Sequence, residues 1–121
     1  MQLTKDSSDA QYQIKKYAPG CITVNNQDYT NSILIMPNYF SAWDINHIQD
    51  LQLEQLQHLM QFQPDVILIG AGEKLVFPKL NTPQIAAQYK VGIEIMTSAA
   101  ACRTYTILVA EQRNVLAALI V

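Results

Sequence analysis

The run VILIG at residues 66–70 constrains the fold more than any other feature of this chain. Pro64 and Asp65 separate it from the segment before it, and its apolar, largely β-branched residues show no polar alternation. Such a run is typical of a strand buried on both faces of a parallel sheet, because it offers no face to water. The sequence therefore predicts a central strand here.

A short amphipathic helix is predicted before this strand. Leu53, Leu56, Leu59 and Met60 follow the three- and four-residue spacing of one helical face. Polar residues take the other faces: Glu54, Gln55, Gln57 and His58.

Two further helices are expected after the strand. The first should cover residues 83–89, with Thr82 as its N-cap and Pro83 at the first helical position, where a missing N–H costs nothing. The second should end near Gln112 and begin at Thr97 or Ser98, since either hydroxyl can accept a hydrogen bond from a free backbone N–H.

The remaining patterned segments predict strands. CITV and QDYT flank Asn25 and Asn26, which tolerate positive φ, so a short antiparallel hairpin is expected there. SILIM is predicted to be a strand that ends at Pro37, because proline has no N–H to donate to the hydrogen bonds between strands. The aromatic stretch after it is expected to be irregular. Two more strands are expected: VGIEIM at 91–96 as another central strand and VLAALIV at 115–121 as the last.

Strands that alternate with helices indicate an α/β fold with crossover connections, and the hairpin makes the sheet mixed. A last strand as apolar as VLAALIV would be prone to aggregation at an open edge. We therefore expect it inside the sheet or covered by another subunit, which is compatible with a homodimer but does not require one.

Composition excludes several classes of protein. The 121 residues suit a single domain, 1–121, in which the polar residues 1–11 are compatible with a flexible start. Eight basic and ten acidic residues give a net charge of −2 without charge runs, which argues against a nucleic-acid partner. Cys21 and Cys102 form no CxxC pair, and no apolar stretch is long enough for a leader or a membrane span. A cytoplasmic protein with reduced thiols is expected.

Three stretches resemble a known family. PDVILIGAGEKLVFP at 64–78 and GIEIMTSAAACRTYTILVAEQRNVLAALI at 92–120 resemble the small family that contains the mitochondrial NADH dehydrogenase (complex I) assembly factor three and its bacterial and archaeal relatives. SILIMPNYFSAW at 32–43 is similar to the early strand and aromatic segment of that family. The most specific pieces are the PDV strand with its Gly-x-Gly loop and the AACRTY helix.

This resemblance implies a three-layer α/β fold around a central mixed sheet, with helices on one side and a small β-hairpin layer on the other. It implies no reaction and no cofactor. The mitochondrial relatives are implicated in assembling the matrix arm of complex I, which implies a protein partner.

A candidate cleft lies where two predicted strands end. Gly70 and Gly72, followed by Glu73, are placed where α/β sheets bind ligands, and Thr97 and Ser98 open a helix whose free N–H groups could face an anion. The loop lacks the third glycine of a nucleotide fingerprint and the spacing of a Walker loop. Tight-turn glycines and simple capping hydroxyls are the alternative interpretation.

Three residues near this cleft carry reactive groups. Cys102 would need a histidine base to act as a nucleophile, and neither His47 nor His58 can be placed near it, so a space-filling core thiol is favoured. Glu94 interrupts an apolar strand, and a structural pair with Arg103 is favoured over general acid or base chemistry. No cluster of residues has metal-ligand spacing.

A candidate partner surface follows Pro37. Tyr39, Phe40 and Trp43 either cap an edge of the core or, where exposed, anchor a protein partner, and Asp28 on the hairpin could rim the same surface.

The sequence leads to two hypotheses about the function of this protein. The favoured one is a non-enzymatic protein-binding, assembly-factor-like protein that acts through the aromatic segment and the hairpin. The alternative is a small cytosolic enzyme or anion-binding module centred on Gly70, Gly72, Ser98 and Arg103.

Overall fold

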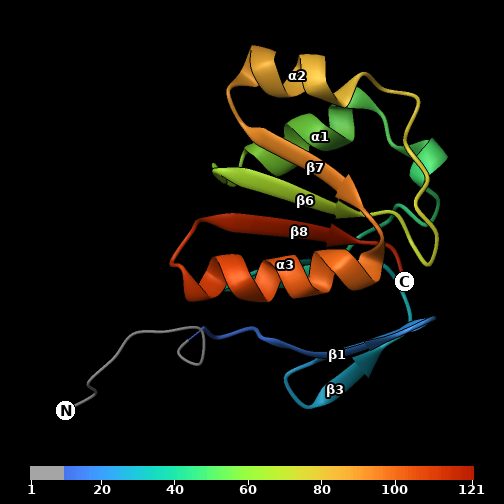
Figure 1. The fold of residues 1–121 in the computed structure, drawn as a ribbon, viewed down its shortest axis with the longest axis vertical. Helices are drawn as coiled ribbons and strands as arrows, with labels where there is room; N and C mark the ends of the chain where they lie inside the picture. The colour runs from blue at the N-terminus through green and yellow to red at the C-terminus, as the bar shows by residue number, and fades with distance from the viewer. Residues whose placement is uncertain (1–9) are drawn as a thin grey trace.

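A computed structural model describes residues 10–121, so most of the flexible start expected at 1–11 lies outside the described residues. Two sheets and three α-helices build the fold (Figure 1). In chain order the elements are β1 (Ile14–Ala18), β2 (Cys21–Val24), β3 (Gln27–Tyr29), β4 (Ile33–Met36), β5 (Tyr39–Ala42), the 3-10 helix η2 (Ile48–Asp50), α1 (Leu53–Met60), β6 (Val66–Gly70), α2 (Thr82–Tyr89), β7 (Gly92–Met96), α3 (Ser98–Ala110) and β8 (Val115–Leu119).

The large sheet is mixed and has the strand order β5-β4-β8-β6-β7. β6 runs parallel to β8 and β7, whereas β4 is antiparallel to both β8 and β5. All residues of β6 and β8 are buried, so the central position predicted for VILIG and the internal position predicted for the last strand are confirmed.

The prediction of a central position for β7 is wrong. Among the described residues, this strand pairs with β6 alone and forms one edge of the large sheet. Its side chains are exposed or half-buried, in contrast to the fully buried neighbour β6. An apolar pattern alone does not reveal whether another strand will pair beyond it.

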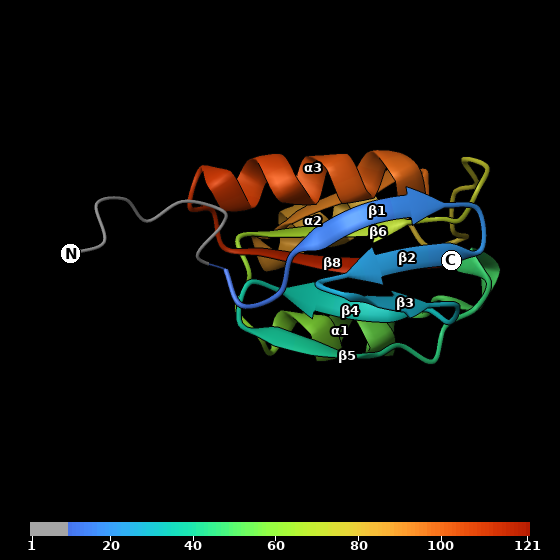
Figure 2. The same ribbon diagram turned by 90° about the horizontal axis from the view of Figure 1, so that it is seen from below.

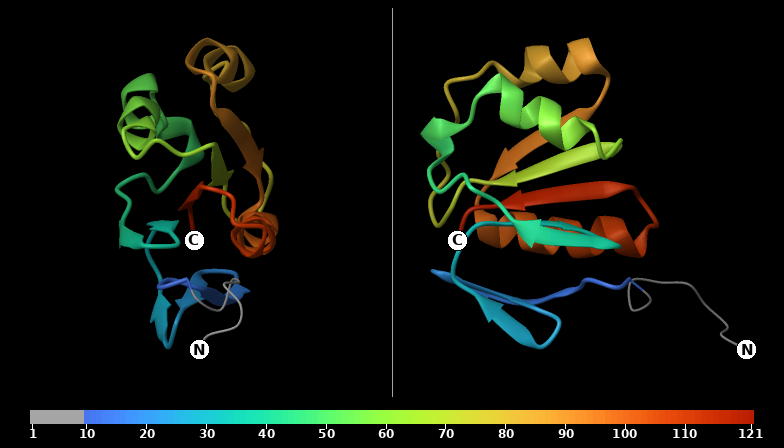
Figure 3. Two further views of the ribbon diagram at one scale, coloured as in Figure 1. Left: turned by 90° about the vertical axis from the view of Figure 1, so that its left-hand side faces the viewer. Right: turned by 180° about the vertical axis from the view of Figure 1, so that it is seen from behind.

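Both faces of the large sheet are covered. α1 packs on one face, where Leu56 and Leu59 meet Ile67 and Leu116, and α2 lies beside the β7 edge (Figure 1). α3 packs on the opposite face, as the left view of Figure 3 shows. The α/β fold class with a mixed sheet and a small β layer is confirmed, but the helices lie on both faces of the large sheet and not on one side as expected, because α3 shares its face with the small β layer.

The small β layer is a three-stranded antiparallel sheet with the order β1-β2-β3, which extends the expected hairpin by one strand. It shares its face of the large sheet with α3, and β1 lies beside that helix (Figure 2). Ile22 from this layer is fully buried together with Ala101 of α3, whose small side chain lets the helix approach closely.

The segment after Pro37, expected to be irregular, instead forms strand β5. Pro37 and Asn38 form a turn, and β5 folds back antiparallel onto β4 with Tyr39 opposite Met36. The weak alternation of the aromatic segment therefore did not reveal the strand that backbone pairing with β4 forms.

The helix caps differ in part from expectation. Asn81, not Thr82, caps α2, because its side-chain oxygen accepts a hydrogen bond from the Gln84 N–H at 3.1 Å. Thr82 is the first helical residue and is buried. Thr97 caps α3 by accepting from the Ala100 N–H at 3.2 Å, which leaves Ser98 available for a different role.

The cap assignment can be tested by mutation. Asn81→Ala should lower the free energy of unfolding by about 1 kcal/mol, because the Gln84 N–H loses its acceptor. Asn81→Ser should retain most of that stability. Equilibrium denaturation in urea measures both changes, and an Asn81→Ala variant as stable as the parent protein would show that the cap contributes nothing.

Candidate functional site

The side chain of Ser98 joins the carboxyl ends of the parallel strands. Its Oγ accepts a hydrogen bond from the Gly72 N–H at 3.0 Å and donates to the carbonyl oxygen of Ile120. Its own N–H donates to the Gly72 carbonyl at 2.9 Å. With 0% of its surface exposed, Ser98 ties the loop after β6 to the end of β8 and to the start of α3.

The two glycines of the GAG loop serve this junction. A Cβ atom at Gly70 would lie 2.7 Å from Ser98 Oγ and 2.9 Å from Ser98 Cα, too close for any side chain. Gly72 has a φ of +111°, a conformation that glycine adopts without strain. Close packing and backbone geometry therefore explain both glycines.

The structure brings Gly70, Gly72, Thr97 and Ser98 of the candidate cleft together, but protein atoms occupy the place of a ligand. The N–H groups of Gly72, Ser98 and Ala100, which an anion would need, each donate to a protein oxygen. Glu73 follows the loop and is exposed. The arrangement is a buried structural junction.

The expected pair between Glu94 and Arg103 is not formed. Glu94 is exposed on the edge strand β7, and Arg103 is exposed on α3. No ion pair joins the two side chains in the part of the chain that the structure describes. The pair was predicted from burial of Glu94 in a central strand, and at the sheet edge water solvates the carboxylate instead.

Cys102 is a core thiol. It is 5% exposed and packs among apolar residues of the α3 face. Burial, which disfavours the thiolate, raises the pKa of Cys102 to about 12, and the neighbouring Arg103 guanidinium opposes this shift only in part. His58 lines a groove on the opposite face of the sheet, so it cannot act as a base for Cys102.

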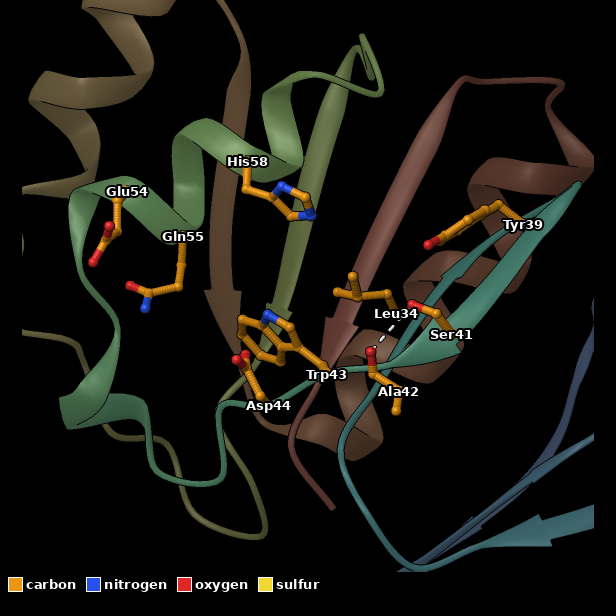
Figure 4. Close-up of a pocket in the computed structure, with 9 residues that line it drawn as sticks. All are labelled: Leu34, Tyr39, Ser41, Ala42, Trp43, Asp44, Glu54, Gln55 and His58. Carbon is orange, nitrogen blue, oxygen red and sulfur yellow. Dashed lines mark hydrogen bonds between the residues drawn. The ribbon is translucent and has the colours of Figure 1, made fainter.

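That groove lies between β5 and α1 and has a volume of about 720 Å³ (Figure 4). Trp43 lies in the middle of it, and His58 extends into it from α1. The lining residues come from β4, β5, the segment after β5 and α1: Leu34, Tyr39, Ser41, Ala42, Trp43, Asp44, Glu54, Gln55 and His58.

The predicted surface residues are divided between two faces of the sheet. Tyr39, 36% exposed, lies on the groove side and packs against Phe62, with ring centroids 4.7 Å apart. Phe40 lies on the other face and contacts the rings of Tyr12 and Tyr29 at 5.5 and 4.8 Å. The aromatic residues therefore form no single exposed patch, because neighbouring residues of a strand point to opposite faces.

Trp43 and Asp28, the other two residues of the predicted partner surface, also lie apart from each other. Trp43 is only 6% exposed and belongs to the core beneath α1, where it forms the floor of the groove. Asp28 is exposed on β3 and accepts a hydrogen bond from the Thr23 hydroxyl at 2.6 Å.

Sequence reasoning missed the acidic side of the groove. Asp44 and Glu54 line it, and no lysine or arginine of the part of the chain that the structure describes does so. The helical spacing correctly placed Glu54, Gln55 and His58 on the polar side of α1. No sequence signal showed that this side would stand opposite β5, because that placement arises from tertiary packing.

Across residues 10–121, no group of three or more His, Cys, Asp or Glu side chains gathers in a way that could hold a metal ion. None of the helices in this region has the length and apolar character needed to cross a membrane.

Comparison with known proteins places the chain among relatives. Residues 14–120 match the family described as "Protein of unknown function (DUF498/DUF598)". The "13 kDa major membrane protein" of Francisella tularensis is 30% identical over 95% of both chains. The NMR structure of a Xanthomonas campestris protein, 32% identical, matches with a TM-score of 0.84 and covers 100% of this chain and 92% of that one.

A further relative carries a functional name. "NADH dehydrogenase [ubiquinone] 1 alpha subcomplex assembly factor 3" of Xenopus tropicalis is 26% identical over 98% of this chain and 66% of that protein. This chain thus spans about two thirds of the length of the frog protein. The resemblance inferred from the PDVILIGAG and AACRTY segments is confirmed.

Removal of the Ser98 hydroxyl should destabilise the fold. In Ser98→Ala, the buried Gly72 N–H and Ile120 carbonyl lose their partner, and each group left unpaired costs about 1–3 kcal/mol of unfolding free energy. Gly70→Ala should lower stability by a similar amount because its Cβ meets Ser98.

Gly92→Ala is a matched control, since a Cβ there would come no closer than 3.3 Å to any neighbour, the Val66 Cγ2, and would meet the Val66 Cβ and the Asp65 carbonyl at an ordinary 3.5 Å. Urea denaturation compares the variants. Equal stability of Gly70→Ala and Gly92→Ala would contradict the role given to Ser98.

The state of Cys102 can be tested by alkylation. At pH 8 iodoacetamide should modify the half-buried Cys21 in the folded protein and spare Cys102, which is neutral and buried; in urea both should react. Because the pKa of Cys102 is raised from 9.0 to about 12, its contribution to stability is complete below pH 9 and decreases as the pH rises from 9 towards 12. Mass spectrometry locates the label, and equally fast modification of both cysteines in the folded protein would refute this assignment.

Proposed function

This chain belongs to the family of proteins of unknown function DUF498/DUF598, and we propose that it is a non-enzymatic factor that holds a partner polypeptide during the assembly of a larger complex. The open groove between β5 and α1 carries the proposal. It combines a buried aromatic floor at Trp43 with polar and acidic walls, a composition suited to an anchored polypeptide segment.

The names of relatives support the class of function. Proteins of Xenopus tropicalis and Drosophila melanogaster that match this chain are named as assembly factors of NADH dehydrogenase. We extend this to the present chain as a proposal: its partner is a subunit of a multi-subunit respiratory enzyme, met in the cytoplasm before or during assembly.

The alternative anion-binding or enzymatic function has less support. The N–H groups of Gly72, Ser98 and Ala100 donate to protein oxygens, and Cys102 is a neutral thiol on the face of the sheet opposite His58. Binding to a partner needs none of these groups, and it uses a surface that the fold leaves open.

The proposal is tested by affinity capture from the cell of origin. Tyr39→Ala should reduce recovery of NADH dehydrogenase subunits by about tenfold, because an exposed aromatic wall of the groove is lost. Phe77→Ala is the matched control, since Phe77 is an exposed aromatic residue (65%) that does not line the groove. Quantitative mass spectrometry compares the captured subunits.

Unchanged capture by Tyr39→Ala together with loss in Phe77→Ala would move the partner surface away from the groove. Absence of NADH dehydrogenase subunits from every sample would refute the proposed class of partner.

A further inference from the structure

The outer edge of β5 has unpaired backbone groups. β5 ends the strand order of the large sheet, and within residues 10–121 its only partner is β4. The Trp43 N–H donates to the Ser32 carbonyl at 2.9 Å, so the hydrogen-bonded pairs with β4 continue at every second residue, at Ser41 and Tyr39. The N–H and C=O groups of Phe40 and the N–H group of Ala42 therefore point away from β4, towards the open edge, whereas the Ala42 carbonyl on that edge accepts a hydrogen bond from the Ser41 hydroxyl at 3.1 Å.

A hollow borders β5 on each face of the sheet. The groove beside α1 lies on one face and has Leu34 and Trp43 as its apolar residues. A second hollow of about 270 Å³ lies on the other face, between β5 and the small sheet, and has Ile33 and Phe40 as apolar residues. Ala42 lines both hollows and marks the edge between them.

The charges around both hollows have one sign. Asp44 and Glu54 line the groove beside α1, and Asp28 lines the second hollow. Among residues 10–121, no lysine or arginine lines either one. Each hollow thus combines apolar contacts with carboxylates, which suits the aliphatic stem and cationic head of a lysine or arginine side chain.

We propose that β5 accepts an extended segment of a partner protein as an added β-strand, and that two successive lysine or arginine residues of this segment place their side chains in the two hollows. This inference rests on the proposed protein-binding function and specifies how the partner segment binds. Successive side chains of a strand point to opposite faces, so one basic residue reaches each hollow. Backbone hydrogen bonds to Phe40 and Ala42 supply affinity, and the two hollows supply specificity.

The carboxylates favour such a partner over a second copy of this chain. Pairing of two β5 edges would bring Asp28, Asp44 and Glu54 of one copy close to the same residues of the other, and like charges oppose that contact. A helix laid in the groove would leave the N–H and C=O groups at the strand edge without partners from the ligand, whereas a strand satisfies them.

The test uses a synthetic peptide, Thr-Val-Thr-Lys-Lys-Thr-Val-Thr, added to the isotopically labelled full chain at low salt. We expect shifted NMR signals and slowed amide hydrogen exchange at Phe40 and Ala42. The same peptide with two glutamates in place of the lysines should bind at least about tenfold more weakly, because it meets carboxylates in both hollows.

Two sets of variants separate backbone pairing from charge. Ala42→Pro removes an N–H that does not pair with β4, so it should leave the fold intact and weaken the lysine peptide by about tenfold through lost edge hydrogen bonds. The double variant Asp44→Asn/Glu54→Gln should weaken the lysine peptide and reduce its preference over the glutamate peptide. Glu94→Gln, an exposed carboxylate on the opposite edge strand, is the control and should bind as the parent protein does.

Three outcomes would overturn strand addition at β5. They are binding of the lysine peptide without changes at Phe40 and Ala42, equal binding of both peptides, and slowed exchange at these amides through self-association of the chain without peptide. Failure of strand addition is distinguishable from failure of the proposed function. If the Ala42→Pro variant still captures NADH dehydrogenase subunits, and Tyr39→Ala abolishes that capture, the proposed partner binding is supported and strand addition at β5 is refuted.

Discussion

The hydrogen bonds of the Ser98 side chain close the end of the large sheet at which the parallel strands finish. In sheets with parallel strands, ligands usually bind beyond the carboxyl ends of the strands. Here the Ser98 hydroxyl fills that place by accepting from the Gly72 N–H and donating to the Ile120 carbonyl. The junction is closed further by the close approach of Ser98 to Gly70, where no side chain fits. The usual ligand site of an α/β fold has thus become part of the core.

With the carboxyl ends of the parallel strands closed, one feature that the fold leaves accessible is the β5 edge of the large sheet. The antiparallel hairpin of β4 and β5 extends the sheet beyond the cover that α1 provides, which opens the groove lined by Trp43 and Glu54. On the other face, the Phe40 ring packs against the rings of Tyr12 and Tyr29, and these contacts hold β5 in place on that face. A rigid edge strand between two hollows is better suited to holding a polypeptide than to chemistry.

Much of the fold follows from local patterns. The strands β6 and β8 are evident as continuous apolar runs, and the helix α1 is evident from the three- and four-residue spacing of its apolar residues. The edge position of β7 is not, since it depends on which segment pairs beyond it, and the predicted Glu94–Arg103 pair failed for the same reason. Asn81 replaced Thr82 as a cap because either residue type can cap, and only the backbone path decides between them.

For the site, the sequence located the aromatic segment but not its geometry. Tyr39 and Trp43 lie on the face opposite Phe40, because side chains alternate along β5, a strand that the sequence pattern did not reveal. Asp44 and Glu54 come to line the same groove only through tertiary packing. The most direct test is a crystal structure of the chain bound to a captured partner segment. We predict an added strand at Phe40 and Ala42 with the Ser98 hydrogen bonds intact; a partner seated at Gly72 with the Ser98 hydroxyl displaced would contradict it.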